Sequence, residues 1–131
     1  MALQGAEILL YPTAIGTEPS HAEIDSAVHW QNVMCGHAGA NIVPLVASSR
    51  IGTERATDED GLKMSFYGSS FIADETGVKV QEADRTSEAI LVHTFDPDFI
   101  RDYREAWGVY RDRRPDLYGT IATHDGRMTT L

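Results

Sequence analysis

Cys35 is the only residue of the chain that could act as a thiol nucleophile. Catalytic thiols need a neighbouring base and an electropositive setting, often at the N-terminus of a helix. The residues around Cys35 instead predict the middle of a helix, and His37, two positions on, falls on a different helical face. We therefore predict a packed, unreactive thiol; an independent thiol enzyme that uses Cys35 is the alternative.

The histidines offer no metal site by their spacing. None of the five lies four residues from another, and no Cys or His pattern matches a zinc site. The glycines of Gly36–Gly39 lie within the predicted helix and do not follow a strand, so they do not resemble a phosphate-binding loop. We expect no metal and no cofactor, and we interpret His37 as a hydrogen-bonded core histidine.

Charged residues give two further candidates. Glu54 comes shortly after Arg50 at the end of a predicted strand, where a carboxylate can bind a cationic substrate or can simply be solvated. The segment Tyr110–Tyr118 mixes three Arg with two Asp and two Tyr. Because Arg pairs with carboxylates and stacks on aromatic rings, this segment is either a solvated face or a docking surface.

Hydrophobic periodicity predicts the elements that must position these residues. An apolar run at 8–11 predicts a buried strand that ends at Pro12, and residues 1–4, closed by Gly5, read as the end of a helix. A helix is predicted from about residue 25. Its expected buried face is Trp30, Val33, Met34, His37 and Ala40 or Asn41.

Further strands are predicted at 43–47, 66–73, 78–80 and 89–95, the second and third forming a hairpin. A short helix is predicted from the Asp96-Pro97 cap to Gly108. This order of elements indicates an α/β fold in which helices cover a sheet.

Composition excludes several classes of protein. The 131 residues suit one domain, and a net charge of −9 argues against a nucleic-acid binder and an anionic-membrane binder. One Cys cannot form a disulfide framework, and no apolar run approaches the roughly 18 residues of a membrane span. Without a visible signal peptide, the expectation is a cytoplasmic protein.

Several segments, in this order, resemble the C-terminal half of the nitrilase superfamily of carbon–nitrogen hydrolases. Each segment is of moderate specificity alone, and their number and order carry the resemblance from about residue 2 to 126. The matching segments are Ala2–Glu7, Tyr11–Gly16, His29–Gln31, Gly36–Asn41, Pro44–Gly52 with Glu54, Phe66–Ala73, and Trp107–Gly108 with Arg111–Tyr118.

The resemblance implies the C-terminal half of an αββα sandwich, a mixed sheet with helices on one face, with residues 1–131 as a partial domain. Family chemistry uses a Cys nucleophile, a Glu base and a Lys that stabilises the tetrahedral intermediate. The resemblance places all three before Met1, so it implies that this chain holds no catalytic residue and that Cys35 is not the nucleophile. Ser49 stands where many relatives have Asn.

Positions in the family also imply roles for residues of this chain. The substrate-pocket candidates are Tyr11, Pro12, Thr13, Ala14, Ile15 and Glu54. The supporting shell is Trp30, His37 and Arg50. The tail, residues 109–131, resembles a subunit-contact segment, with Arg111, Arg113, Arg114 and Tyr118 as the contact candidates.

Two functions follow as hypotheses. In the first, the chain is part of an enzyme that hydrolyses a carbamoyl C–N bond of a small amine to amine, carbon dioxide and ammonia. It is then inactive alone and works in a homo-oligomer or with the missing half. In the second, it is a non-catalytic interaction or binding module built on half of the sandwich.

Overall fold

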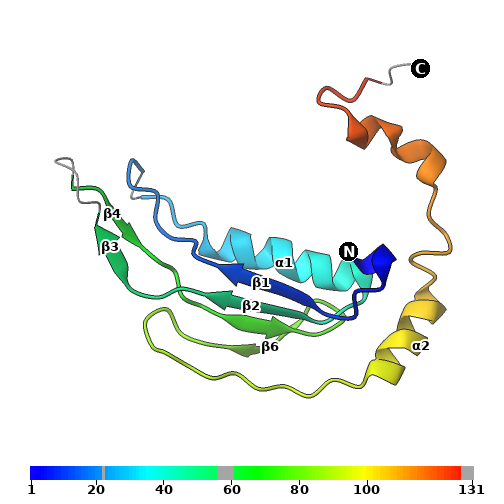
Figure 1. Cartoon of the computed structure of the whole chain (residues 1–131), viewed down its shortest axis with the longest axis horizontal. Helices are drawn as coiled ribbons and strands as arrows, with labels where there is room; N and C mark the ends of the chain where they lie inside the picture. The colour runs from blue at the N-terminus through cyan, green and yellow to red at the C-terminus, as the bar shows by residue number, and fades with distance from the viewer. Residues whose placement is uncertain (22, 56–60, 128–131) are drawn as a thin grey trace.

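A four-stranded mixed sheet with one long helix along it forms the body of the molecule (Figure 1). The computed structural model describes residues 1–21, 23–55 and 61–127. The sheet runs in the order β1 (Leu9–Thr13), β2 (Leu45–Ser49), β5 (Phe71–Ala73) and β6 (Lys79–Glu82). β1 and β2 are parallel and are connected through α1 (Ala27–Asn41), whereas β2–β5 and β5–β6 are antiparallel. This confirms the α/β expectation.

Smaller elements flank the body. A short ribbon of β3 (Thr53–Arg55) and β4 (Lys63–Ser65) extends from one end of the sheet, and α2 (Pro97–Trp107) lies near the other (Figure 1). One 3-10 turn, η1 (Ala2–Gln4), opens the chain and ends at Gly5 with φ 91°, as the helix-end pattern predicts. A second, η2 (Pro115–Ala122), lies in the tail.

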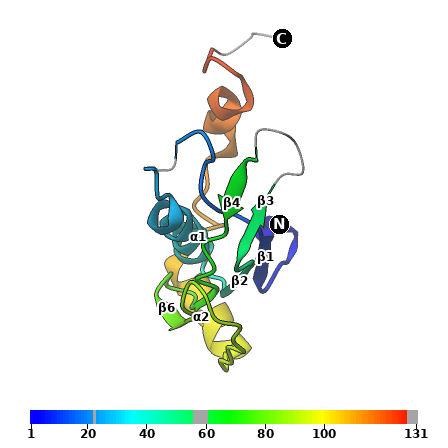
Figure 2. The same cartoon turned by 90° about the vertical axis from the view of Figure 1, so that its left-hand side faces the viewer.

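The core lies between α1 and one face of the sheet (Figure 2). Trp30 of α1 meets Phe71 of β5 edge-on, with ring centroids 5.8 Å apart, and Phe71 is fully buried. The cluster comprises Leu9, Met34, Ala38, Val43, Leu45, Ala47, Phe71 and Ala73. Burial of such side chains from water is the main force that holds the helix on the sheet.

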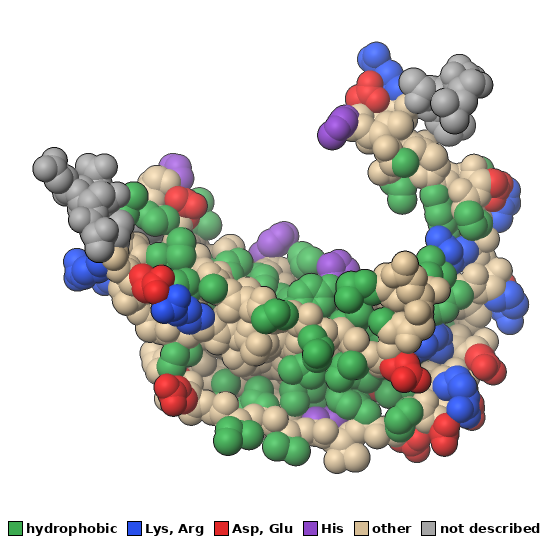
Figure 3. All heavy atoms as spheres, in the orientation of Figure 1, with side chains coloured by type: hydrophobic (Ala, Val, Ile, Leu, Met, Phe, Trp, Pro, Cys, Tyr) green, Lys and Arg blue, Asp and Glu red, His purple; other side chains and the backbone are tan. Residues whose placement is uncertain are grey.

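The other face of the sheet is only partly covered. Along β1, Leu9 is buried while its neighbour Leu10 is 63% exposed, because successive side chains of a strand point to opposite faces. The prediction of a buried strand at 8–11 is therefore right for one face only. Figure 3 shows apolar side chains gathered on the surface of the body that faces the viewer.

The prediction for the buried face of α1 is wrong by about one position. The buried residues are Ala27, Gln31, Met34 and Ala38, whereas Val33 and His37 are exposed. Gln31 can be buried because its amide Nε2 donates to the Ser69 carbonyl at 3.1 Å and to Glu82 Oε1 at 2.7 Å. A hydrophobicity pattern cannot predict the burial of Gln31, because a polar side chain is buried only when its hydrogen-bond partners are in place.

Two strand predictions need correction. The run 66–73 is broken, because Gly68 (φ 57°) and Ser69 (φ 53°) take left-handed conformations that leave only Phe71–Ala73 in the sheet. Residues 89–95 form no strand, and Ile90 there is 92% exposed. Within the described chain this segment has no ladder partner, and a strand exists only when another pairs with it.

The remaining predictions are confirmed. β5 and β6 form the expected hairpin, closed by a turn in which Gly77 (φ 85°) donates to the Asp74 carbonyl. α2 begins at Asp96, whose carboxylate accepts from the backbone N–H groups of Asp98 and Phe99, and ends at Gly108. No helix among the described residues has the length and apolar character needed to cross a membrane.

Candidate functional site

The C-terminal ends of the parallel strands β1 and β2 bring most of the predicted pocket residues together. Thr13 and Ser49 are register partners, and the Arg50 N–H donates to the Thr13 carbonyl at 3.0 Å. The Tyr67 N–H donates to the Ile15 carbonyl at 3.1 Å. Segment 11–15 lies at the end of the strands where ligands of open α/β sheets commonly bind, and its predicted pocket role stays a prediction.

Residues 11–15 divide between the two faces. Tyr11 and Thr13 are half-buried on the α1 side, and the Thr13 hydroxyl donates to the Tyr11 carbonyl at 3.2 Å. Pro12 and Ala14 are exposed, and Ile15 is half-buried. Pro12 does not end the strand as expected, because β1 is an edge strand of the sheet and tolerates the missing N–H.

His37 reaches this segment through Tyr11. The Tyr11 hydroxyl lies 2.9 Å from His37 Nδ1, and the two rings are stacked with centroids 6.1 Å apart. The prediction of a hydrogen-bonded histidine is confirmed, but the prediction of a core position is wrong because His37 is exposed. Trp30, the other supporting residue from α1, packs into the core and not at the strand ends.

Arg50 and Glu54 lie together beside the strand ends. Their side chains form an ion pair, each about half exposed. The Arg50 guanidinium also lies over the Phe66 ring, 4.7 Å from its centroid. A ligand that binds the Glu54 carboxylate would therefore compete with Arg50 for it.

The tail places its Arg residues on local partners. Arg111 pairs with Asp112 and Arg114 with Asp116, while Arg113 lies 5.3 Å from the centroid of the Tyr118 ring. These groups are exposed or half-exposed, and Tyr118 also accepts from the Arg114 N–H. The predicted subunit-contact residues thus contact neighbours within the tail, in two Arg–Asp ion pairs and one Arg–Tyr contact.

Cys35 lacks the surroundings of a catalytic thiol. It is half-buried on α1, and burial raises the pKa of its thiol, an effect that Lys79 partly offsets and Glu82 and Asp74 reinforce. A raised pKa leaves less thiolate at neutral pH. Across the described residues no group of three or more His, Cys, Asp or Glu is arranged to hold a metal ion.

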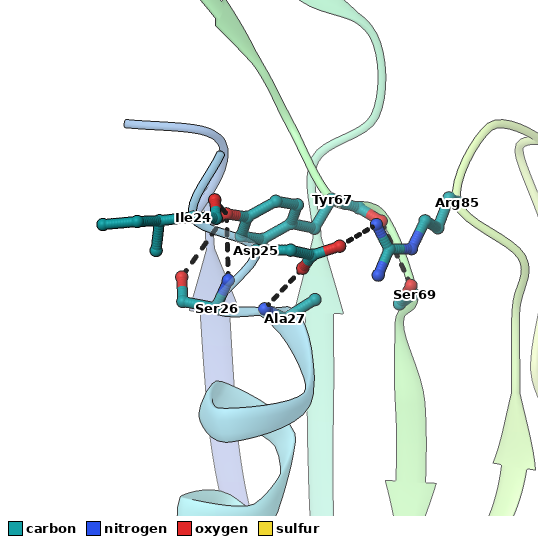
Figure 4. Close-up of polar contacts among 7 residues, drawn as sticks. All are labelled: Ile24, Asp25, Ser26, Ala27, Tyr67, Ser69 and Arg85. Carbon is teal, nitrogen blue, oxygen red and sulfur yellow. Dashed lines mark hydrogen bonds and ion pairs between the residues drawn. The ribbon is translucent and has the colours of Figure 1, made fainter. Parts of the chain in front are cut away.

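A polar cluster that the sequence did not reveal fixes the N-terminus of α1 (Figure 4). The Tyr67 hydroxyl accepts from the Ser26 N–H at 3.2 Å and donates to the Ile24 carbonyl at 3.3 Å. Asp25 accepts from the Ala27 N–H at 3.0 Å and from Arg85 at 2.7 Å. The hydrogen bond from Arg85 lowers the pKa of Asp25. An Asp before a predicted helix was the only signal in the sequence.

A second polar network, also missed, joins α1 to β6. Lys79 Nζ donates to Gln31 Oε1 at 3.0 Å and to Glu82 Oε2 at 2.7 Å. The hydrogen bonds of Lys79 and Gln31 lower the pKa of Glu82, against the opposing effect of its burial. The network satisfies the buried amide of α1, so its role is to hold the sheet and helix in register.

Comparison with known proteins identifies the family. The model of the carbon-nitrogen hydrolase family matches residues 1–105. The chain belongs to the carbon–nitrogen hydrolase family. This confirms the family that the sequence motifs indicated, and the matched region includes the body, the strand ends and most of α2.

Relatives and solved structures agree with this assignment. The chain is 60% identical over 98% of its length to N-carbamoylputrescine amidase of Arabidopsis thaliana, and 54% identical over 92% to citrullinase of Francisella tularensis. A carbon–nitrogen hydrolase structure from Helicobacter pylori G27 superposes with a TM-score of 0.82 at 35% identity, over 95% of the chain. The fold is therefore that of the carbon–nitrogen hydrolases.

The chain spans less than half the length of these carbon–nitrogen hydrolases. It covers 43% of the Arabidopsis protein, 41% of the Francisella protein and 44% of the Helicobacter chain. The family match ends at residue 105, whereas the similarity to the Arabidopsis amidase extends over 129 residues. The tail is thus shared with the amidase relative and lies beyond the general family pattern.

Proposed function

We propose that this chain is part of an amidase that hydrolyses N-carbamoylputrescine, and that it forms the wall of the substrate pocket. The observation that carries the proposal is the 60% identity over 98% of the chain to the Arabidopsis N-carbamoylputrescine amidase. Relatives from potato and tomato with the same name are each 59% identical over 96% of the chain. Similarity at this level extends through both the strand ends and the tail.

In this proposal the nucleophile comes from outside these 131 residues. The Glu takes the proton of a Cys thiol, the thiolate attacks the carbamoyl carbon, the bond from this carbon to its NH2 nitrogen breaks, and ammonia leaves with the proton that the Glu held. Water gives a proton to the Glu and attacks the S-thiocarbamate, the C–S bond breaks, and the Cys sulfur recovers that proton. The released carbamate takes up a proton and yields carbon dioxide and putrescine. A Lys stabilises the oxyanion. Cys35 takes no part, in keeping with its half-buried setting and raised pKa.

The chain supplies binding surface to this reaction. We assign the pocket wall to Tyr11, Pro12, Thr13, Ala14 and Ile15, and the rim to Glu54 with Arg50. His37 supports the wall through its hydrogen bond to Tyr11, and Trp30 supports it from the core. Backbone hydrogen bonds from Arg50 to Thr13 and from Tyr67 to Ile15 tie the segment 11–15 to its neighbours, and a rigid support of this kind favours a pocket wall.

The tail and the assembly belong to the same proposal. We assign the tail, with Arg111, Arg113, Arg114 and Tyr118, to contacts between subunits of a homo-oligomer in the cytoplasm. The row of exposed Arg–Asp pairs and the exposed apolar residues of η2, such as Ile121 at 84%, support this assignment. Arg side chains are enriched at protein interfaces.

A second substrate class is supported by the Francisella relative, named citrullinase, at 54% identity. Citrulline carries the same carbamoyl group on an amino acid, so the chemistry of bond cleavage is shared and only recognition of the distal end differs. The alternative function that involves no catalysis is a binding module.

A hybrid enzyme tests the proposal. The region of the Arabidopsis amidase that matches this chain is replaced by residues 1–131, and ammonia release is measured with N-carbamoylputrescine and with citrulline. We expect the hybrid to hydrolyse N-carbamoylputrescine and the isolated chain to release no ammonia. Preference for citrulline would favour the second substrate, and a monodisperse hybrid inactive on both would favour the binding module.

A further inference from the structure

A hollow of about 300 Å³ lies where α2 meets the last turn of α1 and the β5–β6 turn. Tyr103 and Trp107 line it from α2, Glu75 lines it from the turn, and Ala40 lines it from α1. It is separate from the strand ends that carry the proposed pocket wall, and the proposed reaction uses none of its residues.

The walls of this hollow are fixed in place. A Cβ at Gly39 would lie 2.8 Å from the Thr76 carbonyl oxygen, so only a glycine permits α1 to approach the turn this closely. Within the turn, Asp74 Oδ1 accepts from the N–H groups of Thr76 at 2.9 Å and Val78 at 3.0 Å. On the opposite side, Arg104 Nε donates to the Ile42 carbonyl at 3.0 Å and ties α2 to the end of α1.

Two acceptors that line the hollow have no donor among the described residues. Glu75 has no hydrogen-bond or ion-pair partner among the described residues. The Ala40 carbonyl cannot receive the helical bond from four residues on, because that residue is Pro44, which has no N–H. The end of a helix carries partial negative charge, and at the end of α1 Arg104 donates to the Ile42 carbonyl and not to Ala40. The free carboxylate and the free carbonyl favour a bound cation.

The aromatic side chains add to this preference. The rings of Tyr103 and Trp107 meet at 71°, with centroids 6.0 Å apart, and so form a corner that presents ring surface to the hollow. Aromatic faces attract cations through their quadrupole. An apolar corner beside a carboxylate suits a cation that has an alkyl part.

Two neighbouring hollows beside α2 differ from this one because Arg side chains line them. One beside α2 is lined by Arg101 and Arg104, and the other by Arg104 and Arg111. Neither Lys nor Arg lines the Glu75 hollow, and Arg104 reaches only the carbonyl of Ile42 beside it.

We propose that this hollow binds a primary alkylammonium ion. The ammonium group donates to the Glu75 carboxylate and the Ala40 carbonyl, and the alkyl chain lies against Tyr103 and Trp107. An ammonium group has three donors and no acceptor, which matches the free carboxylate of Glu75 and the free carbonyl of Ala40. A simple alkylamine or diamine is the class of ligand that fits.

Titration of the ¹⁵N-labelled chain with n-butylammonium chloride tests the proposal, with n-butanol and sodium chloride as controls. We expect saturable chemical-shift changes at Gly39, Ala40, Thr76 and the Trp107 indole, and none of them with either control. Absence of saturable changes at these positions, or equal changes with n-butanol, would overturn it. The measurement needs no turnover, so its outcome is independent of the proposed amidase activity.

Variants locate the binding. Glu75→Gln removes the charge and keeps the shape, and we expect it to weaken binding by about tenfold or more. Glu105→Gln, an exposed carboxylate of α2 that lines a different hollow, is the matched control and should leave binding unchanged. Trp107→Leu should also weaken binding while Phe99→Leu should not. Equal affinity in Glu75→Gln and the parent chain would contradict the assignment even if binding is seen.

Discussion

The body and the C-terminal segment treat apolar side chains in opposite ways. In the body, Phe71 and Leu45 are fully buried between α1 and the sheet. In the segment after residue 82, Ile90 is 92% exposed, Val92 74% and Ile121 84%. The two regions differ in strand pairing. Strands of the body are hydrogen-bonded to one another, whereas residues 89–95 form no ladder with any residue that the structure describes.

This contrast separates what the chain stabilises by itself from what it presents to other surfaces. The two regions are tied at a few points, among them Arg85 to Asp25 and Arg104 to the Ile42 carbonyl. A cooperative body carrying a loosely packed segment fits a chain that spans less than half of its relatives' length. The following substitutions test whether the division between body and segment is as sharp as the structure indicates.

The largest difference is expected between Phe71→Ala and Ile90→Ala. Removing the Phe71 ring opens a cavity in the core, so we expect the free energy of unfolding to fall by about 3–5 kcal/mol. Truncating the exposed Ile90 should change it by no more than about 0.5 kcal/mol. Urea denaturation followed by circular dichroism measures both. Similar losses would mean that residues 89–95 are packed and would remove the contrast.

Two glycines of α1 give the next largest difference. An Ala at position 39 would clash with the Thr76 carbonyl, so we expect Gly39→Ala to lower the free energy of unfolding by about 1–3 kcal/mol. Nothing lies within 4 Å of a Cβ at Gly36, and Gly36→Ala should raise it by about 0.5–1 kcal/mol through helix propensity. Thermal unfolding of the pair separates them. A stabilising Gly39→Ala would show that α1 does not rest on the β5–β6 turn.

Two serines at the strand ends test the polar part of the body. The Ser70 hydroxyl accepts from the Ser49 N–H at 2.9 Å and donates to the Ser49 carbonyl at 3.3 Å. The Ser49 hydroxyl is buried with no hydrogen-bond partner among the described residues. We expect Ser70→Ala to cost about 1 kcal/mol and Ser49→Ala to be neutral or stabilising. A larger loss of stability for Ser49→Ala than for Ser70→Ala in urea denaturation would show that the Ser49 hydroxyl has a hydrogen-bond partner.

A smaller effect is expected from the pH-dependent ion pair of Asp25 with Arg85, which ties the two regions together. The pKa of Asp25 is lowered in the folded chain by Arg85, so its contribution to stability is present above about pH 4 and is lost as the pH falls below that value. Asp25→Asn should therefore be less stable than the parent chain at neutral pH, with a gap that narrows in acid. Urea midpoints across that pH range measure the gap. A gap independent of pH would mean that the charge of Asp25 contributes nothing.

Asp84 provides the comparison within the C-terminal segment. Backbone N–H groups of Thr86 and Ser87 lower its pKa to about 2. Asp84→Asn should also be less stable than the parent chain at neutral pH. Because the hydrogen bonds of Asp84 are confined to one local turn, we expect a smaller change in the urea midpoint of unfolding than for Asp25→Asn.

Much of the body could be predicted from the sequence because its patterns are local. The helix at 27–41, the β5–β6 hairpin and the Asp96 cap of α2 follow from spacing, turn residues and capping chemistry. The strand at 66–73 could not be predicted in full, because two adjacent left-handed residues, Gly68 and Ser69, break it. A positive φ at a serine is decided by its surroundings and not by its own preference.

The site shows the same division. The placement of residues 11–15 and Arg50 at one sheet edge follows from the parallel pairing of two predicted strands. The exposed position of His37 and the cluster of Asp25, Tyr67 and Arg85 do not follow, because they depend on long-range hydrogen bonds. The strand predicted at 89–95 failed because strand formation requires a partner.

Replacement of Cys35 in the hybrid amidase tests the central claim most directly. We propose that this chain supplies the pocket wall, and its only thiol, Cys35, is a half-buried residue of α1. Ammonia release from N-carbamoylputrescine by the hybrid carrying Cys35→Ser should therefore continue at the rate of the parent hybrid. Loss of turnover in a hybrid that is still folded and monodisperse would give Cys35 a part in the reaction and would contradict its assignment as a packing residue.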